Sequence, residues 1–372
     1  MPVDVGDDGP PSQRGGADDP RTAEVLDWYD RHRRRLPWRA EPDQLADPYA
    51  VWLSEIMLQQ TTVKAVKPYF ERFLGQWPTV SDLANAPLND VLSAWAGLGY
   101  YARARNLHKA AVMVRDEFSG RFPDTEDDLR TLPGVGAYTA AAIAAIAFGQ
   151  KATPVDGNIE RVMARLFDIR EPLPKAKPTL KLRAESLTPD QRAGDFAQAL
   201  MDLGATICTP KTPACVLCPL TTDCKATAAG VAADLPKKLP KKPKPVRRGA
   251  AFCIVRADGA VLLRQRPPEG LLGGMSELPG SPWQDADSVD PGQRRILDHA
   301  PMSAQFVKLP GSVRHVFTHF ELDLTIWRAR FSQATPPPPD HWWSLPEDQE
   351  SEALPSVMRK ALAAGLSGAD IR

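Results

Sequence analysis

Four of the chain's five cysteines lie within seventeen residues, at Cys208, Cys215, Cys218 and Cys224. Four soft thiolates this close together are typical of one metal centre, because tetrahedral sulfur ligation suits both zinc and iron–sulfur clusters. Structural zinc sites usually pair two short Cys-x2–4-Cys knuckles, and this spacing contains only one. The spacing therefore favours an iron–sulfur cluster over zinc, with local disulfides as a less favoured alternative in a reducing compartment.

A second candidate site is the run 132–136, Leu-Pro-Gly-Val-Gly, which lies between two helical patterns. Two glycines let the backbone turn tightly and come close to a ligand. The helix that follows offers free N–H groups and the positive end of its dipole, and this combination binds a phosphate without a basic side chain. On its own the run fits two interpretations, a phosphate-binding hairpin and an ordinary connection between helices.

One acidic residue, Glu55, stands out because it lies in the apolar helical stretch 51–58. Burial there would raise its pKa and keep the carboxyl group protonated, as a general acid requires. By itself, however, an acid in a helix is more often a cap or an ion-pair partner.

The 372-residue chain carries a formal net charge of zero, but the charge is unevenly placed. Acidic residues gather in the predicted disordered tail, 1–20, and basic residues cluster at 31–39 and 237–248. A local basic face matters more for a nucleic-acid partner than the total charge, although solvated charge without a partner is the alternative. Because no signal peptide and no apolar run of membrane-spanning length is present, we expect a cytoplasmic protein without membrane contact.

The elements that must position these groups change in kind along the chain. Residues 21–230 show apolar residues at helical spacing, which predicts an all-helical domain with helices at 22–35, 50–58, 61–74, 88–95, 101–117, 137–148, 159–166 and 196–206. The Pro- and Lys-rich segment 231–248 reads as a stiff basic linker. Strand-like runs at 250–255, 260–263 and 320–328, with a helix at 357–364, then predict a smaller α+β domain, 249–372.

Taken together, the run 132–136, the segment Pro154-Val-Asp-Gly-Asn158 and the four cysteines resemble the helix-hairpin-helix DNA glycosylases of the endonuclease III superfamily. Bifunctional members carry a lysine just after the hairpin glycines, where this chain has Tyr138. Three further motifs, at 36–39, 52–61 and 97–101, are similar to the MutY family of adenine DNA glycosylases. The similarity extends over residues 22–230.

The resemblance implies a monofunctional, monomeric enzyme of base excision repair that removes adenine mispaired with 8-oxoguanine or guanine in double-stranded DNA. It implies that Glu55 donates a proton to the N7 atom of adenine. It implies that Asp156 stays ionised and stabilises the cationic sugar, directly or through a covalent link, with Tyr138 and Asn158 as hydrogen-bonding partners of this site. Such a division of labour between two carboxyl groups is the one that glycoside hydrolysis uses.

The resemblance also implies how DNA and cofactor are held. The cysteines would bind a [4Fe–4S] cluster. Gln60 and Tyr100 would wedge into the duplex, which offsets the cost of flipping the base out of the stack. The hairpin would grip DNA phosphates at Leu132, Gly134, Val135 and Gly136.

The second domain contains the segment 265–280, which resembles the strand–loop part of Nudix folds. A Nudix hydrolase would carry its Mg²⁺-binding acidic residues in the segment that begins at position 281, and this segment lacks them. This matches the MutT-like domain of the MutY family, which recognises 8-oxoguanine with a Phe-Ser-His loop. Here the loop reads Phe317, Thr318 and His319, and the threonine keeps the hydroxyl while adding a methyl group. Metal ligation by His315 and His319 stays open as an alternative.

Three rival functions are weaker. A bifunctional pyrimidine glycosylase is disfavoured by Tyr138, because the nucleophilic lysine is absent. A non-catalytic DNA-binding or redox-sensing iron–sulfur protein is disfavoured by Glu55 together with Asp156. A nucleotide hydrolase is disfavoured by the incomplete Nudix motif.

Overall fold

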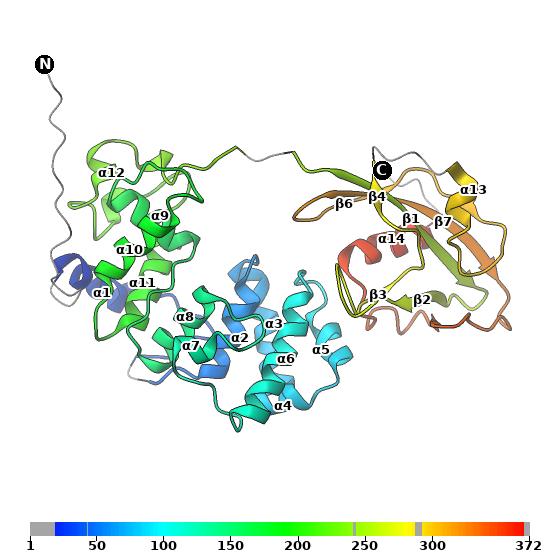
Figure 1. Ribbon diagram of the computed structural model, residues 1–372, viewed down its shortest axis with the longest axis horizontal. Coiled ribbons are helices and arrows are strands. Elements are labelled where there is room, and N and C mark those ends of the chain that lie inside the picture. The colour runs from blue at the N-terminus through cyan, green and yellow to red at the C-terminus, as the bar shows by residue number, and fades with distance from the viewer. Residues whose placement is uncertain (1–18, 43, 241–242, 287–291, 368–372) are drawn as a thin grey trace, which may run out of the picture. The chain divides into compact units, whose positions relative to one another are not determined.

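The structure is a computed structural model that describes residues 19–42, 44–240, 243–286 and 292–367 (Figure 1). The predicted disordered tail therefore lies outside the described residues, except for Asp19 and Pro20. The chain divides into two compact units, one formed by residues 1–81 and 110–240 and the other by 82–109 and 241–372. No helix among the described residues is long and apolar enough to cross a membrane.

Several helices of the first unit begin where the sequence supplies a capping side chain. Asp19, Asp47, Thr62 and Asp156 each accept a hydrogen bond from a backbone N–H group in the first turn of a helix, which satisfies a donor that the helix leaves free. The elements of this unit are α1 (Pro20–His32), α2 (Pro48–Leu58), α3 (Val63–Gln76), α7 (Glu126–Leu129), α8 (Ala137–Phe148), α9 (Gly157–Leu166), α10 (Lys177–Leu187), α11 (Ala193–Thr206) and α12 (Lys225–Ala228), with short 3-10 turns η2 (Cys215–Leu217) and η3 (Ala232–Asp234).

The remaining helices before the linker are α4 (Val80–Asn85), α5 (Leu88–Trp95) and α6 (Ala102–Glu117). The apolar spacing predicted α5 and α8 at their observed bounds and most other helices within a few residues. It missed the short helices α4, α7 and α12 and the longer helix α10. Pro178 stands in the first turn of α10, where its missing N–H group costs nothing.

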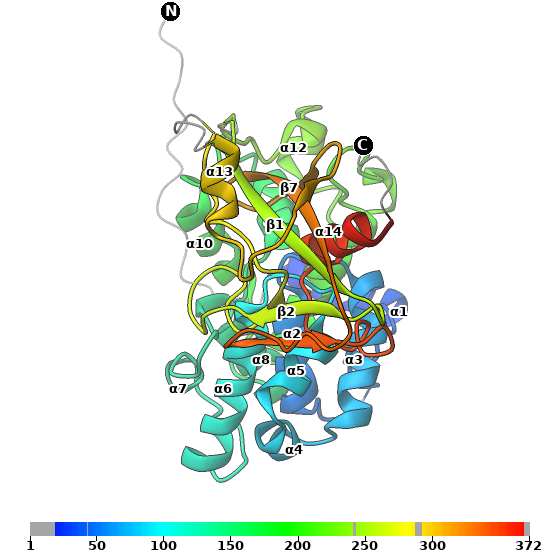
Figure 2. The same cartoon turned by 90° about the vertical axis from the view of Figure 1, so that its right-hand side faces the viewer.

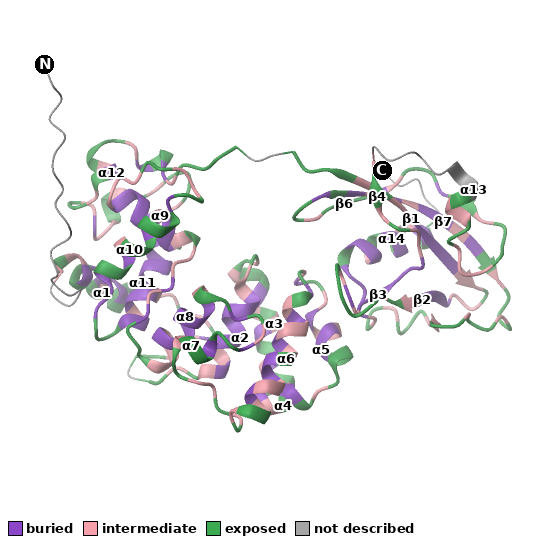
Figure 3. Cartoon of the chain, in the orientation of Figure 1, coloured by how far each residue is buried: buried purple, intermediate pink, exposed green. Residues whose placement is uncertain are grey.

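The core of the first unit forms around α8, most of whose residues are buried (Figure 3). Helices α2, α7 and α11 pack against it. Gly194 at the start of α11 lets the two backbones approach closely, since a Cβ atom there would lie 2.4 Å from the carbonyl oxygen of Ala145. As a result, residues of α2, α8 and α11 lie close together in the interior of this unit.

The second unit contains an eight-stranded sheet in which the long strands β1 (Val246–Arg256) and β7 (Glu321–Phe331) pair in parallel along their whole length (Figure 2). The path runs β3-β2-β1-β7-β5, and β4, β6 and β8 pair with β1, β7 and β2. The shorter strands are β2 (Val261–Gln265), β3 (Ser276–Glu277), β4 (Gln284–Asp285), β5 (Val307–Lys308), β6 (Val313–Val316) and β8 (His341–Ser344).

Both faces of this sheet are covered, and the alternation of side chains along β1 explains how. Ala251 and Cys253 belong to the core cluster that includes α14 (Ser356–Ser367), whereas Phe252 and Ile254 belong to a second cluster with residues of α13 (Gly292–Leu297). Successive residues of a strand point to opposite faces, so β1 is buried on both sides, as its apolar run requires.

The linker is shorter than the segment predicted from composition. Its first residues pack on the first unit, because Leu235 is buried and the N–H group of Leu173 donates to the carbonyl oxygen of Lys237 at 2.9 Å. Its last residues already belong to β1. Proline and lysine content marks a lack of helix, but it does not reveal backbone pairing with a neighbouring loop.

Candidate active site

Glu55 is a buried carboxyl group on α2, with 7% of the residue exposed. Burial raises its pKa to about 7, the nearby charge of Asp156 adds to this effect, and a hydrogen bond with Tyr138 and the charge of Arg39 oppose it. Glu55 lines a cavity of about 50 Å³ together with side chains from α2, α11 and the segment between α1 and α2, among them Arg34, Trp38, Arg39, Gln198 and Met201. A carboxyl group of this kind can hold a proton near neutral pH.

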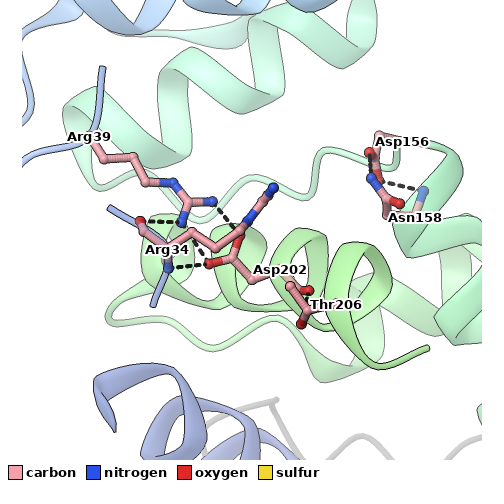
Figure 4. Close-up of polar contacts among 6 residues, drawn as sticks. All are labelled: Arg34, Arg39, Asp156, Asn158, Asp202 and Thr206. Carbon is pink, nitrogen blue, oxygen red and sulfur yellow. Dashed lines mark hydrogen bonds and ion pairs between the residues drawn. The ribbon is translucent and has the colours of Figure 1, made fainter. Parts of the chain in front are cut away.

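Asp156 is both a predicted site residue and the N-cap of α9. Its Oδ1 atom accepts the backbone N–H groups of Asn158 (2.9 Å) and Ile159 (2.8 Å), and its Oδ2 atom accepts the side-chain amide of Asn158 (2.7 Å; Figure 4). Burial raises the pKa of Asp156 above its ordinary value, although these three donors favour the ionised form. The carboxylate is thus fixed in orientation by its own helix.

A chain of hydrogen bonds connects this aspartate to the cysteine segment. Arg161 donates to the side-chain oxygen of Asn158 (2.9 Å), to the carbonyl oxygen of Gly204 (2.7 Å) and to the carbonyl oxygen of Cys208 (2.7 Å). Gly204 on α11 makes the close approach possible, since a Cβ atom at this position would lie 2.6 Å from the Cβ atom of Asn158. Asp156 and the cysteine segment are therefore connected through Asn158 and Arg161.

The four predicted metal-binding cysteines line a single cavity of about 20 Å³. Arg165, which is 1% exposed, donates to the Sγ atom of Cys208 (3.2 Å) and to the carbonyl oxygens of Thr209 and Pro210. Burial raises the pKa of the Cys218 thiol to about 12, so a thiolate there needs a positive partner. Three or more His, Cys, Asp or Glu side chains do not converge on one ion-binding point among the described residues. The donor set fits a thiolate-bound cluster, and zinc stays an alternative.

The hairpin 132–136 connects α7 and α8. The side chains of Leu132 and Val135 are buried, with 2% and 6% exposed, so they anchor the turn and cannot reach a ligand. Gly134 adopts a left-handed conformation with a φ of 80°, and Gly136 is the N-cap of α8 with no side-chain cap. Because no side chain covers the first N–H groups of α8, any anion here would be held by the backbone.

The two predicted wedge residues share an unusual backbone. Gln60, just after α2, and Tyr100, just before α6, are both exposed and have positive φ values of 58° and 50°. Non-glycine residues avoid this region, and those found there cluster at functional sites. Within the second unit, the Thr318 hydroxyl donates to the Tyr100 hydroxyl at 3.0 Å.

The loop with the predicted 8-oxoguanine reader joins β6 to β7. Phe317 stacks on Phe320 at 4.8 Å between ring centroids and also contacts Trp283 and His315. Thr318 and His319 are exposed at the tip. The phenylalanine ring is therefore part of an aromatic cluster that supports the loop, whereas the Thr318 hydroxyl donates to Tyr100 and the His319 imidazole is exposed.

The sheet domain also contains a cavity of about 480 Å³. Its lining of mixed polarity includes Arg247, Arg264, Arg266, Glu277 and Trp283. Glu277 is 3% exposed and pairs with Arg264 (2.9 Å) and Arg266. Two guanidinium groups thus pair with this buried carboxylate.

The structure adds residues that the sequence analysis did not single out. Arg161 and Arg165 follow Asn158 at helical spacing, which would have placed all three on one face of α9. Asp202 gave no such signal, because its partners Arg34 and Arg39 are more than 160 residues away in the chain.

Comparisons with known proteins agree with this architecture. Residues 53–189 match the HhH-GPD superfamily of base excision DNA repair proteins, and residues 250–364 match the NUDIX domain family. The structure of a thermostable thymine-DNA glycosylase is 32% identical, with a TM-score of 0.50, and the match covers 56% of this chain and 95% of that one. The class is therefore a helix-hairpin-helix base excision repair glycosylase with a Nudix-like second domain.

Relatives narrow the class further. The adenine DNA glycosylase of Homo sapiens is 35% identical over an alignment of 397 positions, which covers 90% of this chain and 72% of that protein. The adenine DNA glycosylase of Mycolicibacterium smegmatis is 43% identical over 207 residues, which is 56% of this chain and 69% of that protein. The chain belongs to the adenine DNA glycosylase family.

The contact between Gly204 and Asn158 leads to a testable expectation. Gly204→Ala should destabilise the folded protein by about 1–3 kcal/mol, because the added methyl group overpacks a site where backbone must move. Gly75→Ala in α3 is the matched control, since a Cβ atom there meets no atom within 4 Å. Thermal unfolding of both full-length variants would test this, and equal melting temperatures would contradict the close packing.

Proposed function

We propose that the protein is a monofunctional glycosylase that hydrolyses the N-glycosidic bond of adenine paired with guanine or 8-oxoguanine in double-stranded DNA. Membership of the adenine DNA glycosylase family supports the reaction class. The single observation that carries the site assignment is the buried Glu55 carboxyl, with a pKa near 7, beside the charge of Asp156. Tyr138 stands where a bifunctional enzyme would carry its lysine, and its bond to Glu55 makes it a partner of the acid.

The chemistry follows from the two carboxyl groups. Glu55 donates its proton to the N7 atom of adenine, so the base leaves as a neutral molecule and the electrons of the C–N bond go with it. Asp156, which accepts hydrogen bonds from Asn158 and from its own helix that favour its ionised form, stabilises the positive charge that develops on the sugar. Water then adds to the sugar carbon and releases a proton, which restores the acid.

We further propose that DNA is held largely by backbone N–H groups and by two side chains whose backbone has positive φ values. The N–H groups after Gly134 and Gly136 would bind a phosphate at the start of α8. Gln60 and Tyr100 would enter the base stack when the adenine flips out. Nothing in this arrangement requires a second copy of the chain, so we propose that it acts as a monomer, in the cytoplasm where thiols stay reduced.

We propose that the cysteines hold a [4Fe–4S] cluster, whose role when bound is to tie the segment 208–224 together. Four thiols around one cavity and the cation of Arg165 beside Cys208 support this. Through Arg161, the same segment supports Asn158, so loss of the cluster would loosen the support of the site.

We also propose that residues 249–372 read 8-oxoguanine through Thr318 and His319, with residues 21–230 as the glycosylase domain. The support is that both side chains are exposed at the tip of a loop that aromatic packing holds in place. A hydroxyl and an imidazole can bond to the edge of a base.

The acid assignment predicts a separation of binding from cleavage. Glu55→Gln should bind a duplex with an adenine:8-oxoguanine mispair as wild type does, but its single-turnover rate should fall at least about 10²-fold, the usual range for a lost proton donor. Glu71→Gln, an exposed acid on α3, should keep the wild-type rate. Glu55→Gln cleaving at the wild-type rate would remove Glu55 from the mechanism, and an inactive wild type would refute the proposed function.

The cluster assignment predicts a metal content. Protein purified without oxygen should contain about four iron atoms and matching sulfide per chain, and Cys218→Ser should lose them together with visible absorbance. Cys253→Ala, which alters the buried cysteine of β1, should keep the iron. One zinc ion per chain without iron would decide for the alternative.

The reader assignment predicts a loss of discrimination. Thr318→Ala with His319→Ala should lower the ratio of excision rates opposite 8-oxoguanine and guanine by about 5- to 150-fold, because one good base contact contributes about 1–3 kcal/mol. Val307→Ala, an exposed residue of β5, is the control. An unchanged ratio at matched salt would show that other residues read the lesion.

A further inference from the structure

A fully buried carboxylate lies near the acid pair but belongs to neither catalytic role. Asp202 on α11 has 0% exposure. It accepts four hydrogen bonds, from the backbone N and Nε atoms of Arg34 (2.9 and 2.6 Å) and from both terminal nitrogens of Arg39 (2.7 Å each). Figure 4 shows the two guanidinium groups turned toward this single carboxylate. Because a buried ion pair is a weak source of stability, the position of this pair points to a further role.

The pair joins the segment between α1 and α2 to α11. Arg39 also donates to the carbonyl oxygen of Arg34 at 3.2 Å, which closes the segment on itself. Trp38, which lies between Arg34 and Arg39 in the chain, is buried and contacts Phe70 edge to face, with 5.3 Å between ring centroids. Asp202 therefore fixes where the guanidinium of Arg39 can lie.

That guanidinium lies on the cavity of the general acid. Arg34, Arg39 and Glu55 line the same cavity, and the positive charge of Arg39 lowers the pKa of Glu55. The other groups that act on Glu55 are Tyr138 from α8 and Asp156 at the start of α9. Burial would lower the pKa of Arg39, but its bonds to Asp202 keep that pKa above the ordinary value. Arg39 is thus a permanent cation whose effect on Glu55 depends on its counter-charge.

We propose that Asp202 is a positioning residue for the reaction, which holds Arg39 in place and balances its charge so that Glu55 keeps the proton that the leaving base requires. Without Asp202, Arg39 would turn its unbalanced charge toward Glu55, the nearest remaining carboxyl group on the cavity. The inference rests on the proposed function for its consequence, but the arrangement of charges is independent of it.

Two substitutions that should shift the pH midpoint of excision in opposite directions test the inference. Excision requires protonated Glu55, so the single-turnover rate falls as pH rises through its pKa. Asp202→Asn keeps the shape but removes the counter-charge, and the midpoint of this fall should move to lower pH by at least about 0.5 units. Above the midpoint the rate then drops about threefold or more. Arg39→Gln removes the cation itself, and the midpoint should move to higher pH.

Control variants separate charge from packing. Asp202→Glu retains the charge and should keep the wild-type midpoint even if its rate is lower. The double variant Asp202→Asn with Arg39→Gln should return the midpoint toward that of Arg39→Gln, because no cation is left to balance. Asp195→Asn, a partly exposed carboxylate on the same helix that pairs with Arg192, should leave the midpoint unchanged.

A readout without catalysis keeps the inference separate from the proposed function. The carboxyl signal of Glu55 in ¹³C-labelled full-length protein, assigned by its loss in Glu55→Gln, should titrate with the same opposite shifts in Asp202→Asn and Arg39→Gln. A wild type inactive on adenine mispairs would refute the function, and these titrations would still decide the inference. If Asp202→Asn alone does not fold, the double variant decides: a midpoint equal to that of Arg39→Gln supports action through Arg39, and a clearly different one overturns the inference. Unchanged midpoints in the folded variants would show that Asp202 only holds the fold together.

Discussion

The burial of one carboxyl group is the constraint on which this structure depends. A charged glutamate inside a helical core costs several kcal/mol unless it is paired or neutralised, and the core around α8 leaves Glu55 with 7% exposure. The low-dielectric surroundings resolve the cost by raising its pKa to about 7. The same packing that stabilises the helices therefore also brings the pKa of this group close to neutral pH.

The other charges near this group are each restrained in a different way. Asp156 is restrained by its own helix, which supplies backbone and side-chain donors to both oxygens. Arg39 is restrained by a carboxylate from another helix. The site therefore contains a glutamate whose pKa burial raises to about 7, an aspartate held by its own helix and an arginine paired with a carboxylate. Preorganised charges of this kind need not reorient when the sugar becomes cationic.

The cysteine segment extends this organisation beyond the acids. Helix α9 carries Asn158 toward Asp156 and Arg161 and Arg165 toward the cysteines. A single helix thus connects the candidate site with the candidate metal centre, and Gly204 allows α11 to lie directly against it. In the sheet domain, by contrast, aromatic packing supports an exposed loop, and the buried Glu277 is taken up by two arginines.

Much of this could be predicted from the sequence, because the signals are local. Apolar spacing located α5 and α8 at their bounds, the cysteine spacing indicated one centre, and the segment around Asp156 marked a helix start. What the sequence left open depends on contacts between distant residues. The burial of Leu132 and Val135, which leaves only backbone to face an anion, follows from how α7 packs on α8. The role of Asp202 required α11 to meet a loop more than 160 residues earlier. Helix and motif come from short-range chemistry, whereas the protonation of an acid comes from the whole set of charges and apolar groups that the tertiary fold gathers around it.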